Sequence, residues 1–216
     1  MFALMLTAAL SGASAQGPLP PIAPPDPVAS ALARYHSVES YRVDIRSFHH
    51  DMEEHILYFY KKPGYVRMEF IRPHPGALLV YDPDTRRVRL WPFGFGHFPE
   101  LNLSPSNPLI KGAGGERADR SDVGALLENI RALQQGGSTQ IVGQEQIGGR
   151  ALLHLVTTGG GSFSVSGVHR YELWLDAASE FPAKVVSRDA SDAVMETVLM
   201  DAPEINATLP PALFNP

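Results

Sequence analysis

Apolar and polar residues alternate in short runs along much of this 216-residue chain. The pattern is clearest over residues 41–46, where Tyr, Val and Ile alternate with Arg and Asp. A two-residue period puts successive side chains on opposite faces of a strand, so each run predicts a β-strand with one buried face. Turn residues follow at intervals of about 10 residues, as in consecutive antiparallel hairpins. The chain is therefore expected to be mainly β, in an α+β arrangement.

The predicted strands form two groups. The first group covers residues 41–46, 56–60, 66–70, 78–81 and 87–91. The second group covers residues 139–146, 150–158, 171–175, 183–188 and 193–200. Turn signals join neighbouring strands, such as Lys62-Pro63-Gly64 in the first group and Gly148-Gly149 in the second. Each group should be an antiparallel meander, and because neither has closing elements of its own, both should share one domain.

Two helices are expected beside these strands. Apolar residues at helical spacing between Leu126 and Leu133, followed by Gly136-Gly137, predict a helix over 121–135 with Ser121 as its N-cap. A shorter amphipathic helix should begin at Asp26 or Ser30 and end near His36.

The apolar surface of the predicted sheet is large for so few helices. Ten aromatic residues lie between Tyr58 and Phe98. Two helices cover only part of so wide a face, which would leave an apolar hollow, and such hollows are where hydrophobic ligands bind. The alternative is that these side chains form a dry core.

The N-terminus carries an export pattern. Residues 2–10 are a short apolar run, and Ala13-Ser14-Ala15 follows, which predicts a signal peptide over 1–15 with cleavage before Gln16. The alternative is a buried N-terminal helix. Residues 16–27 contain six prolines and should be an extended leader, because proline fixes φ and removes a backbone donor. We expect a folded domain over 28–216 that is soluble in the periplasm.

The composition excludes several classes of protein. The chain has no cysteine, which excludes disulfides, thiolate zinc sites and cysteine nucleophiles. Its net charge of -5 argues against a nucleic-acid partner. Seven Lys and Arg residues between 61 and 89 form either a solvated sheet face or a rim that meets anionic head groups or an acidic partner.

No catalytic or metal-binding pattern stands out. Residues 49–55, His-His-Asp-Met-Glu-Glu-His, are rich in metal-ligand types but lack helical His-Glu-x-x-His spacing and should form a solvated turn at a hairpin end. Glu53 and Glu54 are adjacent, so in a strand they face opposite ways, which does not suit joint acid–base work. The glycine runs at 112–115 and 159–161 lack the context of a phosphate or dinucleotide loop. We expect no enzyme activity, no catalytic residues, no metal and no cofactor.

Several segments together resemble a known family. They are the Tyr-x-Val-x-Ile strand, Lys62-Pro63-Gly64-Tyr65-Val66-Arg67-Met68-Glu69-Phe70, Pro73, Leu79-Val80-Tyr81-Asp82, Val88-Arg89-Leu90-Trp91, Asp201-Ala202-Pro203-Glu204-Ile205-Asn206, Leu209-Pro210 and Phe214-Asn215-Pro216. With these segments in this order, the chain resembles the periplasmic lipoprotein carriers of the LolA type, also called outer-membrane lipoprotein-sorting proteins. The most specific piece is the Lys-Pro-Gly-x-x-Arg turn and strand.

The resemblance implies an incomplete antiparallel β-barrel of about ten to eleven strands, with helices covering the concave face. It implies a monomer that takes lipoprotein acyl chains or a phospholipid from an inner-membrane transporter and passes them to an outer-membrane acceptor. Carried over by position, the cavity residues would be Val43, Ile45, Tyr58, Val66, Met68, Phe70, Val88, Leu90, Leu127, Ile130, Tyr171, Leu173, Leu175 and Val185.

Two other functions stay open on the sequence. The sigma-E regulatory proteins of the envelope share this half-barrel and bind an anti-sigma factor, so an envelope-stress sensor is the main alternative. An envelope hydrolase is a third hypothesis, which depends only on the 49–55 cluster.

Overall fold

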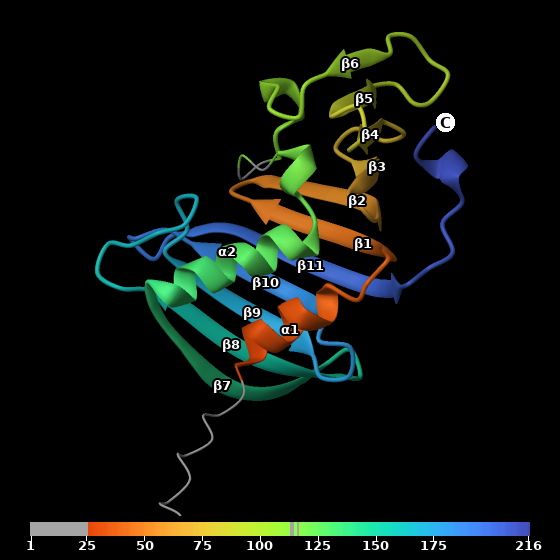
Figure 1. Ribbon diagram of the computed structural model, residues 1–216. Coiled ribbons are helices and arrows are strands. Elements are labelled where there is room, and N and C mark those ends of the chain that lie inside the picture. Colours follow the sequence, from red (N-terminus) through yellow and green to blue (C-terminus); the bar gives the residue numbers. More distant parts are fainter. Residues whose placement is uncertain (1–25, 113–114, 116) are drawn as a thin grey trace, which may run out of the picture.

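The computed structural model describes residues 26–112, 115 and 117–216. Eleven strands form one antiparallel sheet in the order β6-β5-β4-β3-β2-β1-β11-β10-β9-β8-β7 (Figure 1). Their bounds are β1 Ser40–His49, β2 Met52–Lys61, β3 Tyr65–Arg72, β4 Leu78–Asp82, β5 Arg87–Trp91, β6 Leu101–Leu103, β7 Gly137–Ile147, β8 Arg150–Gly159, β9 Arg170–Asp176, β10 Pro182–Arg188 and β11 Val194–Ile205. The expected mainly β, incomplete barrel is confirmed, since β6 and β7 remain unjoined edges.

The predicted signal peptide over 1–15 and most of the leader over 16–27 lie outside the described residues. Within the residues that are described, no helix is long and apolar enough to cross a membrane.

The two predicted strand groups meet at the centre of the sheet, where the first strand in the sequence, β1, pairs with the last, β11. β1 pairs with β2 on one side and with β11 on the other, so Ile45 lies between Ile56 and Met200. β11 continues to Ile205, five residues past the predicted end of that strand. The short strand β6 was not predicted, and it pairs with β5 through Leu90 and Leu101.

Two α-helices lie across the same face of the sheet, α1 (Pro27–Tyr35) and α2 (Val123–Gln135), with α2 crossing the β8–β11 half (Figure 1). Asp26 caps α1 by accepting from the amides of Val28 and Ala29. The expected N-cap of the second helix was wrong by one residue. Asp122, not Ser121, accepts from the first-turn amides of α2.

The main core lies between α2 and the sheet. Leu127, Ile130 and Leu133 of α2 are fully buried and belong to one cluster with Leu155 and Leu173. Burying each such side chain contributes about 1.5–3 kcal/mol, so this helix is held mainly by its apolar stripe.

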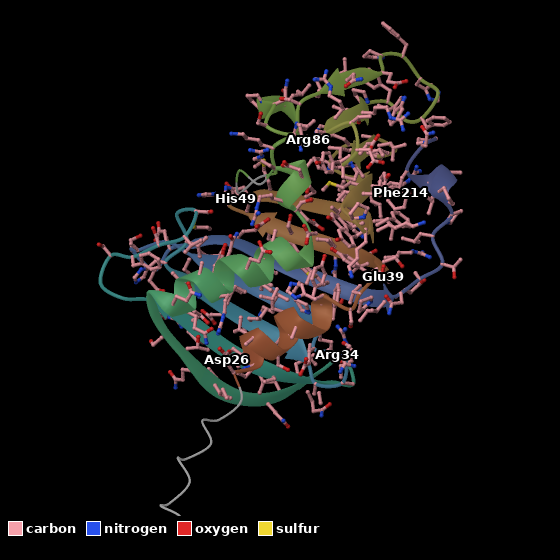
Figure 2. All side chains as sticks on the ribbon, in the orientation of Figure 1. Asp26, Arg34, Glu39, His49, Arg86 and Phe214 are labelled. Atoms are coloured by element: carbon pink, nitrogen blue, oxygen red, sulfur yellow. The ribbon has the colours of Figure 1, made fainter. Side chains whose placement is uncertain are left out.

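A smaller core lies on the opposite face of the β1–β5 half. Phe214 from the C-terminal segment packs there with Trp91 and Phe59, and Figure 2 labels Phe214 beside this half of the sheet, on the side away from α2. Arg67 and Arg89 donate to the carbonyls of Leu213 and Phe214, which fixes the backbone of this segment. The apolar sheet is therefore covered on this outer face, and its inner face is the one with space left.

Candidate ligand-binding cavity

A cavity of about 650 Å³ lies between the inner face of the sheet and the segment that leads into α2. Its floor is a continuous apolar surface that spans several paired strands. The floor side chains are Ile45, Ile56, Met68, Phe70, Leu79, Leu90, Val185, Val198 and Met200. The volume lies within the range of about 300–1,000 Å³ that is usual for small-molecule sites.

Strand register explains why these side chains meet. Ile45 is opposite Ile56 and Met200, and Ile56 is opposite Phe70. Side chains at directly paired positions share a face of the sheet, so residues far apart in sequence form one row across β3, β2, β1 and β11. The hydrophobic floor is thus a product of long-range pairing.

The roof of the cavity is built by two short 3₁₀ helices, η1 (Pro108–Ile110) and η2 (Ala118–Arg120), and by the start of α2. The side chain of Asn107 accepts from the Leu109 amide and begins η1. Ser121 donates to the carbonyl of Ala118, which closes the turn between η2 and α2. Ile110, Ala118 and Leu126 face the cavity from this roof.

A group of stacked tyrosines fixes the roof to the sheet. The ring of Tyr41 stacks on those of Tyr58 and Tyr60, with centroid distances of 5.8 and 5.1 Å. The Tyr41 hydroxyl accepts from the Val123 amide at 3.1 Å, and the Tyr58 hydroxyl lies 3.2 Å from Ser121 Oγ. The start of α2 is therefore held at a defined height above β1 and β2.

These tyrosines cannot easily ionise. Burial raises the pKa of Tyr41 and Tyr58 well above the ordinary value, and neighbouring groups, including Asp122, raise them further. Burial and the adjacent Asp122 carboxylate raise the pKa of Tyr35 in the same way. The cluster therefore acts as a set of neutral hydrogen-bonding groups at one end of the cavity.

Half of the residues expected to form the cavity line it in the structure. These are Ile45, Tyr58, Met68, Phe70, Leu90, Tyr171 and Val185. The other half are buried in the main core and are not among the residues that line the cavity; they are Val43, Val66, Val88, Leu127, Ile130, Leu173 and Leu175. A role in lipid binding for any of the fourteen remains a prediction.

Several lining residues were not identified from the sequence. Ile56 and Leu79 belong to runs that are apolar on both faces, so alternation alone could not assign their direction. Val198 and Met200 lie in the last strand, whose pairing with β1 spans most of the chain. The roof residues Ile110 and Leu126 come from a segment with no strand pattern. Strand register was the missing information for the floor residues, and the position of the roof over the sheet was missing for Ile110 and Leu126.

Two exposed apolar residues lie at the rim of the cavity. Phe93 and Leu109 are 69% and 66% exposed. Both also line the cavity, so the apolar surface continues from the interior to the outside. Apolar surface that stays exposed beside a cavity often marks an interaction site.

The histidine-rich segment 49–55 forms the predicted hairpin end, with a turn at His50 and Asp51 between β1 and β2. Its potential ligands diverge, because Nε2 of His55 contacts the Asp44 carboxylate at 2.8 Å while Glu54 lines the cavity. Across the described part of the chain, no group of three or more His, Asp or Glu residues is placed to hold a metal ion.

Comparison with known proteins identifies a class of fold. No family model and no curated sequence matches the chain. Among solved structures, an uncharacterized conserved protein from Thermus thermophilus is similar over 88% of this chain and 94% of that chain, with 12% identity and a TM-score of 0.56. MucB in complex with MucA(peri) is similar over 87% of this chain, with 14% identity and a TM-score of 0.53, and the match spans 58% of that chain.

A putative outer membrane lipoprotein-sorting protein domain from Vibrio parahaemolyticus is also similar, at 12% identity and a TM-score of 0.42, over 88% of this chain and 94% of that chain. The observed architecture, an open antiparallel sheet with helices across one face, is the half-barrel that the LolA-type resemblance implies. At these identities the likeness concerns the fold alone.

Proposed function

We propose that this protein is a periplasmic carrier that binds the acyl chains of lipoproteins or related lipids and transfers them toward the outer membrane. The observation that carries the proposal is the 650 Å³ cavity with its apolar floor of paired strand residues. It is supported by the continuity of this surface with the exposed Phe93 and Leu109 at the mouth, where a chain would enter.

The energetics of such a site are favourable for an acyl chain. Each methylene group removed from water contributes about 0.8 kcal/mol, so roughly ten buried methylenes would contribute about 8 kcal/mol. Immobilising the ligand offsets part of this gain. The result is binding that is tight enough to shield the chain and weak enough to release it, without any chemical step.

Identification of the bound lipid tests the proposal. The protein is purified without detergent from the envelope of the cells that make it, and native mass spectrometry is compared with denaturing mass spectrometry. The proposal expects a mass difference that organic extraction assigns to an acylated compound. If the native protein carries no such mass, and a fluorescent long-chain fatty-acid probe does not bind either, the proposal is wrong.

The transfer role requires partners, which we propose to be an inner-membrane transporter as donor and an outer-membrane protein as acceptor. A second candidate function is an envelope-stress sensor with the same half-barrel. The MucB structure favours it, because it is similar to this chain at a TM-score of 0.53 and shows MucB in complex with MucA(peri). Recovery of an inner-membrane signalling protein with the tagged chain would support the sensor, whereas recovery of a transporter would support the carrier.

A further inference from the structure

The loop that joins β5 to β6 carries three exposed phenylalanines. Residues 92–99 read Pro-Phe-Gly-Phe-Gly-His-Phe-Pro, and Figure 1 shows this loop at the outer end of the sheet, away from α1 and α2. Phe95 and Phe98 are 56% and 92% exposed, and Phe93 at the cavity rim is exposed as well. Single exposed apolar residues are ordinary, but three large ones in one short loop indicate an interaction surface.

The backbone of this loop has a defined shape. The Gly94 amide donates to the Trp91 carbonyl, and the His97 amide donates to the Gly94 carbonyl, so one turn follows another. Gly94 and Gly96 have φ values of 97° and 80°, a region that glycine adopts more readily than other residues. The ring of Phe95 meets that of the buried Trp91 edge-on, at 5.6 Å between centroids. The fold of the loop itself therefore exposes the phenylalanines.

A second loop, residues 73–77 between β3 and β4, lies against the first. A Cβ atom on Gly94 would lie 3.2 Å from the carbonyl oxygen of Gly76, so the two backbones are in contact. His74 of the second loop and Phe93 of the first both line the cavity. The two loops together form part of the cavity rim, and we call them the rim loops.

The rim loops carry no carboxylate. Their titratable side chains are His74 and His97, and Arg72 comes directly before the first of them, while Glu100 follows the second. Arg72 is 66% exposed and lies 3.5 Å from Glu53. Burying a carboxylate in an apolar medium is unfavourable, and cations near a membrane surface are attracted to anionic lipids. The charge pattern of these loops is therefore compatible with contact with a lipid bilayer.

We propose that the rim loops are a membrane-docking surface, on which Phe95 and Phe98 insert into the interface of a phospholipid bilayer. This goes beyond the proposed function, in which proteins act as donor and acceptor. It rests on the proposed acyl-binding function for one point, namely that the ligand of the cavity comes from a bilayer. Docking would place the cavity rim against the lipid, so an acyl chain would enter with little exposure to water.

The form of this surface favours a bilayer over a protein partner. Interfacial segments bury apolar side chains about 5–10 Å deep at the boundary between head groups and acyl chains, where no complementary shape is needed. Protein interfaces instead fit their anchor side chains into pockets surrounded by a polar rim. Phe98 is 92% exposed on an outlying loop, which suits insertion into a fluid apolar medium.

A dye attached to the rim loops tests docking directly. Because the chain has no cysteine, His97→Cys provides a single attachment site for an environment-sensitive nitrobenzoxadiazole dye. Thr85→Cys, in the turn at the other end of β5, is the matched control, since both positions are exposed. On addition of vesicles made of equal parts of phosphatidylcholine and phosphatidylglycerol, emission from position 97 should rise and shift to shorter wavelength. Emission from position 85 should not change.

Removal of one phenylalanine assigns the contact. Phe98→Ala should weaken binding to these vesicles, measured by cosedimentation, at least about tenfold, because the ring would no longer leave water. Ile141→Ala shortens an exposed side chain of the edge strand β7 and should bind the vesicles as the wild type does. Neither residue lines the cavity, so a fluorescent fatty-acid probe should bind both variants with unchanged affinity.

The outcomes separate docking from the function on which it rests. A wild-type protein that binds the probe but not the vesicles would overturn docking and leave acyl binding in place. Vesicle binding that Phe98→Ala does not weaken, or a dye at position 97 that stays in water, would place the contact elsewhere and overturn the assignment. Vesicle binding without probe binding would support docking and contradict the acyl-binding function.

Discussion

The hydroxyl of Tyr35 in α1 donates to the Asp122 carboxylate at 2.9 Å, and the same carboxylate oxygen caps α2. One acceptor atom therefore joins the two helices that cover the sheet. It receives the amides of Gly124 at 2.7 Å and Ala125 at 3.2 Å in addition to the tyrosine hydroxyl. The position of the cavity roof depends on this shared acceptor, since η2 leads directly into α2.

Removing the tyrosine hydroxyl should destabilise the protein. A hydrogen bond to a charged group contributes about 1.5–3 kcal/mol, so we expect Tyr35→Phe to lower the free energy of unfolding in urea by that amount. Asp122→Ala should cost about 1 kcal/mol more, because it also removes the cap of α2. In a double-mutant cycle the two changes should not be additive. Additive effects would show that the two side chains do not interact.

Gly124 of α2 lies against the ring of Tyr35 in α1. A Cβ atom added at this position would lie 2.4 Å from Cε1 of Tyr35. Gly124→Ala should therefore destabilise the protein by about 1–3 kcal/mol, although alanine is favoured over glycine in a helix by about 1 kcal/mol. In a Tyr35→Leu background the cost of the same change should be smaller, and the part that remains should come from Asp122 Oδ1, which lies 2.7 Å from the added Cβ. Thermal unfolding of the four proteins checks this, and an equal cost in both backgrounds would contradict the close approach of the ring.

The buried tyrosines predict a stability limit at high pH. Burial, strengthened by Asp122, raises the pKa of Tyr35 and Tyr58 far above the ordinary value of 10.0. A raised folded-state pKa means that this stability is complete below pH 10 and is lost as the pH rises further. Absorbance at 295 nm should show that these tyrosines ionise only when circular dichroism reports unfolding. Reversible ionisation in the folded protein would contradict their burial.

The lowered pKa of Asp26 predicts that the stability of the protein also depends on pH in the acid range. Partial burial alone would raise the pKa of Asp26, but hydrogen bonds from Gln134 and the Ala29 amide and the charge of Arg131 lower it below 3.8. A lowered folded-state pKa means that this stability is present above pH 4 and is lost as the pH falls. Asp26→Asn, which keeps a capping side chain, should reduce the loss of stability between about pH 4 and pH 2. An unchanged acid profile would show that the carboxylate charge contributes nothing.

The sequence predicted which segments form strands and helices better than it predicted which strands pair. Alternation through Tyr41, Val43 and Ile45 located β1, and helical spacing located α2, because each pattern is local. The pairing of β1 with β11 joins residues such as Ile45 and Met200 that are far apart in the chain, and no local pattern reports it. Strand β6 was missed because it is three residues long between proline-rich segments.

The candidate site shows the same division. Met68 and Phe70 were expected to face the cavity and do, whereas Val66 of the same strand is buried in the core. Alternation predicts the face of the sheet on which a side chain lies. It does not predict at which positions along the strand the roof packs on that face and at which it leaves a cavity. The charged roof residues Arg117 and Arg120 carry no periodic signal, so only the folded chain brings them to the cavity.

The central claim is that the cavity binds an acyl chain, and filling it tests that claim. Met68 lies on the floor, where a tryptophan would project into free space. Ile71 lies on the same strand, does not line the cavity and is 43% exposed, so Ile71→Trp is the matched control. The free energy of unfolding of both variants should lie within about 1–2 kcal/mol of the wild-type value, since neither tryptophan has to displace a packed neighbour.

The decisive measurement is a titration of a fluorescent long-chain fatty-acid probe into the wild type, Met68→Trp and Ile71→Trp. We expect the wild type and Ile71→Trp to bind one probe with the same affinity. Met68→Trp should bind it at least about tenfold more weakly, a loss of about 1.4 kcal/mol, which is less than two buried methylene groups. Equal affinity of all three folded proteins would place the acyl chain elsewhere and contradict the claim.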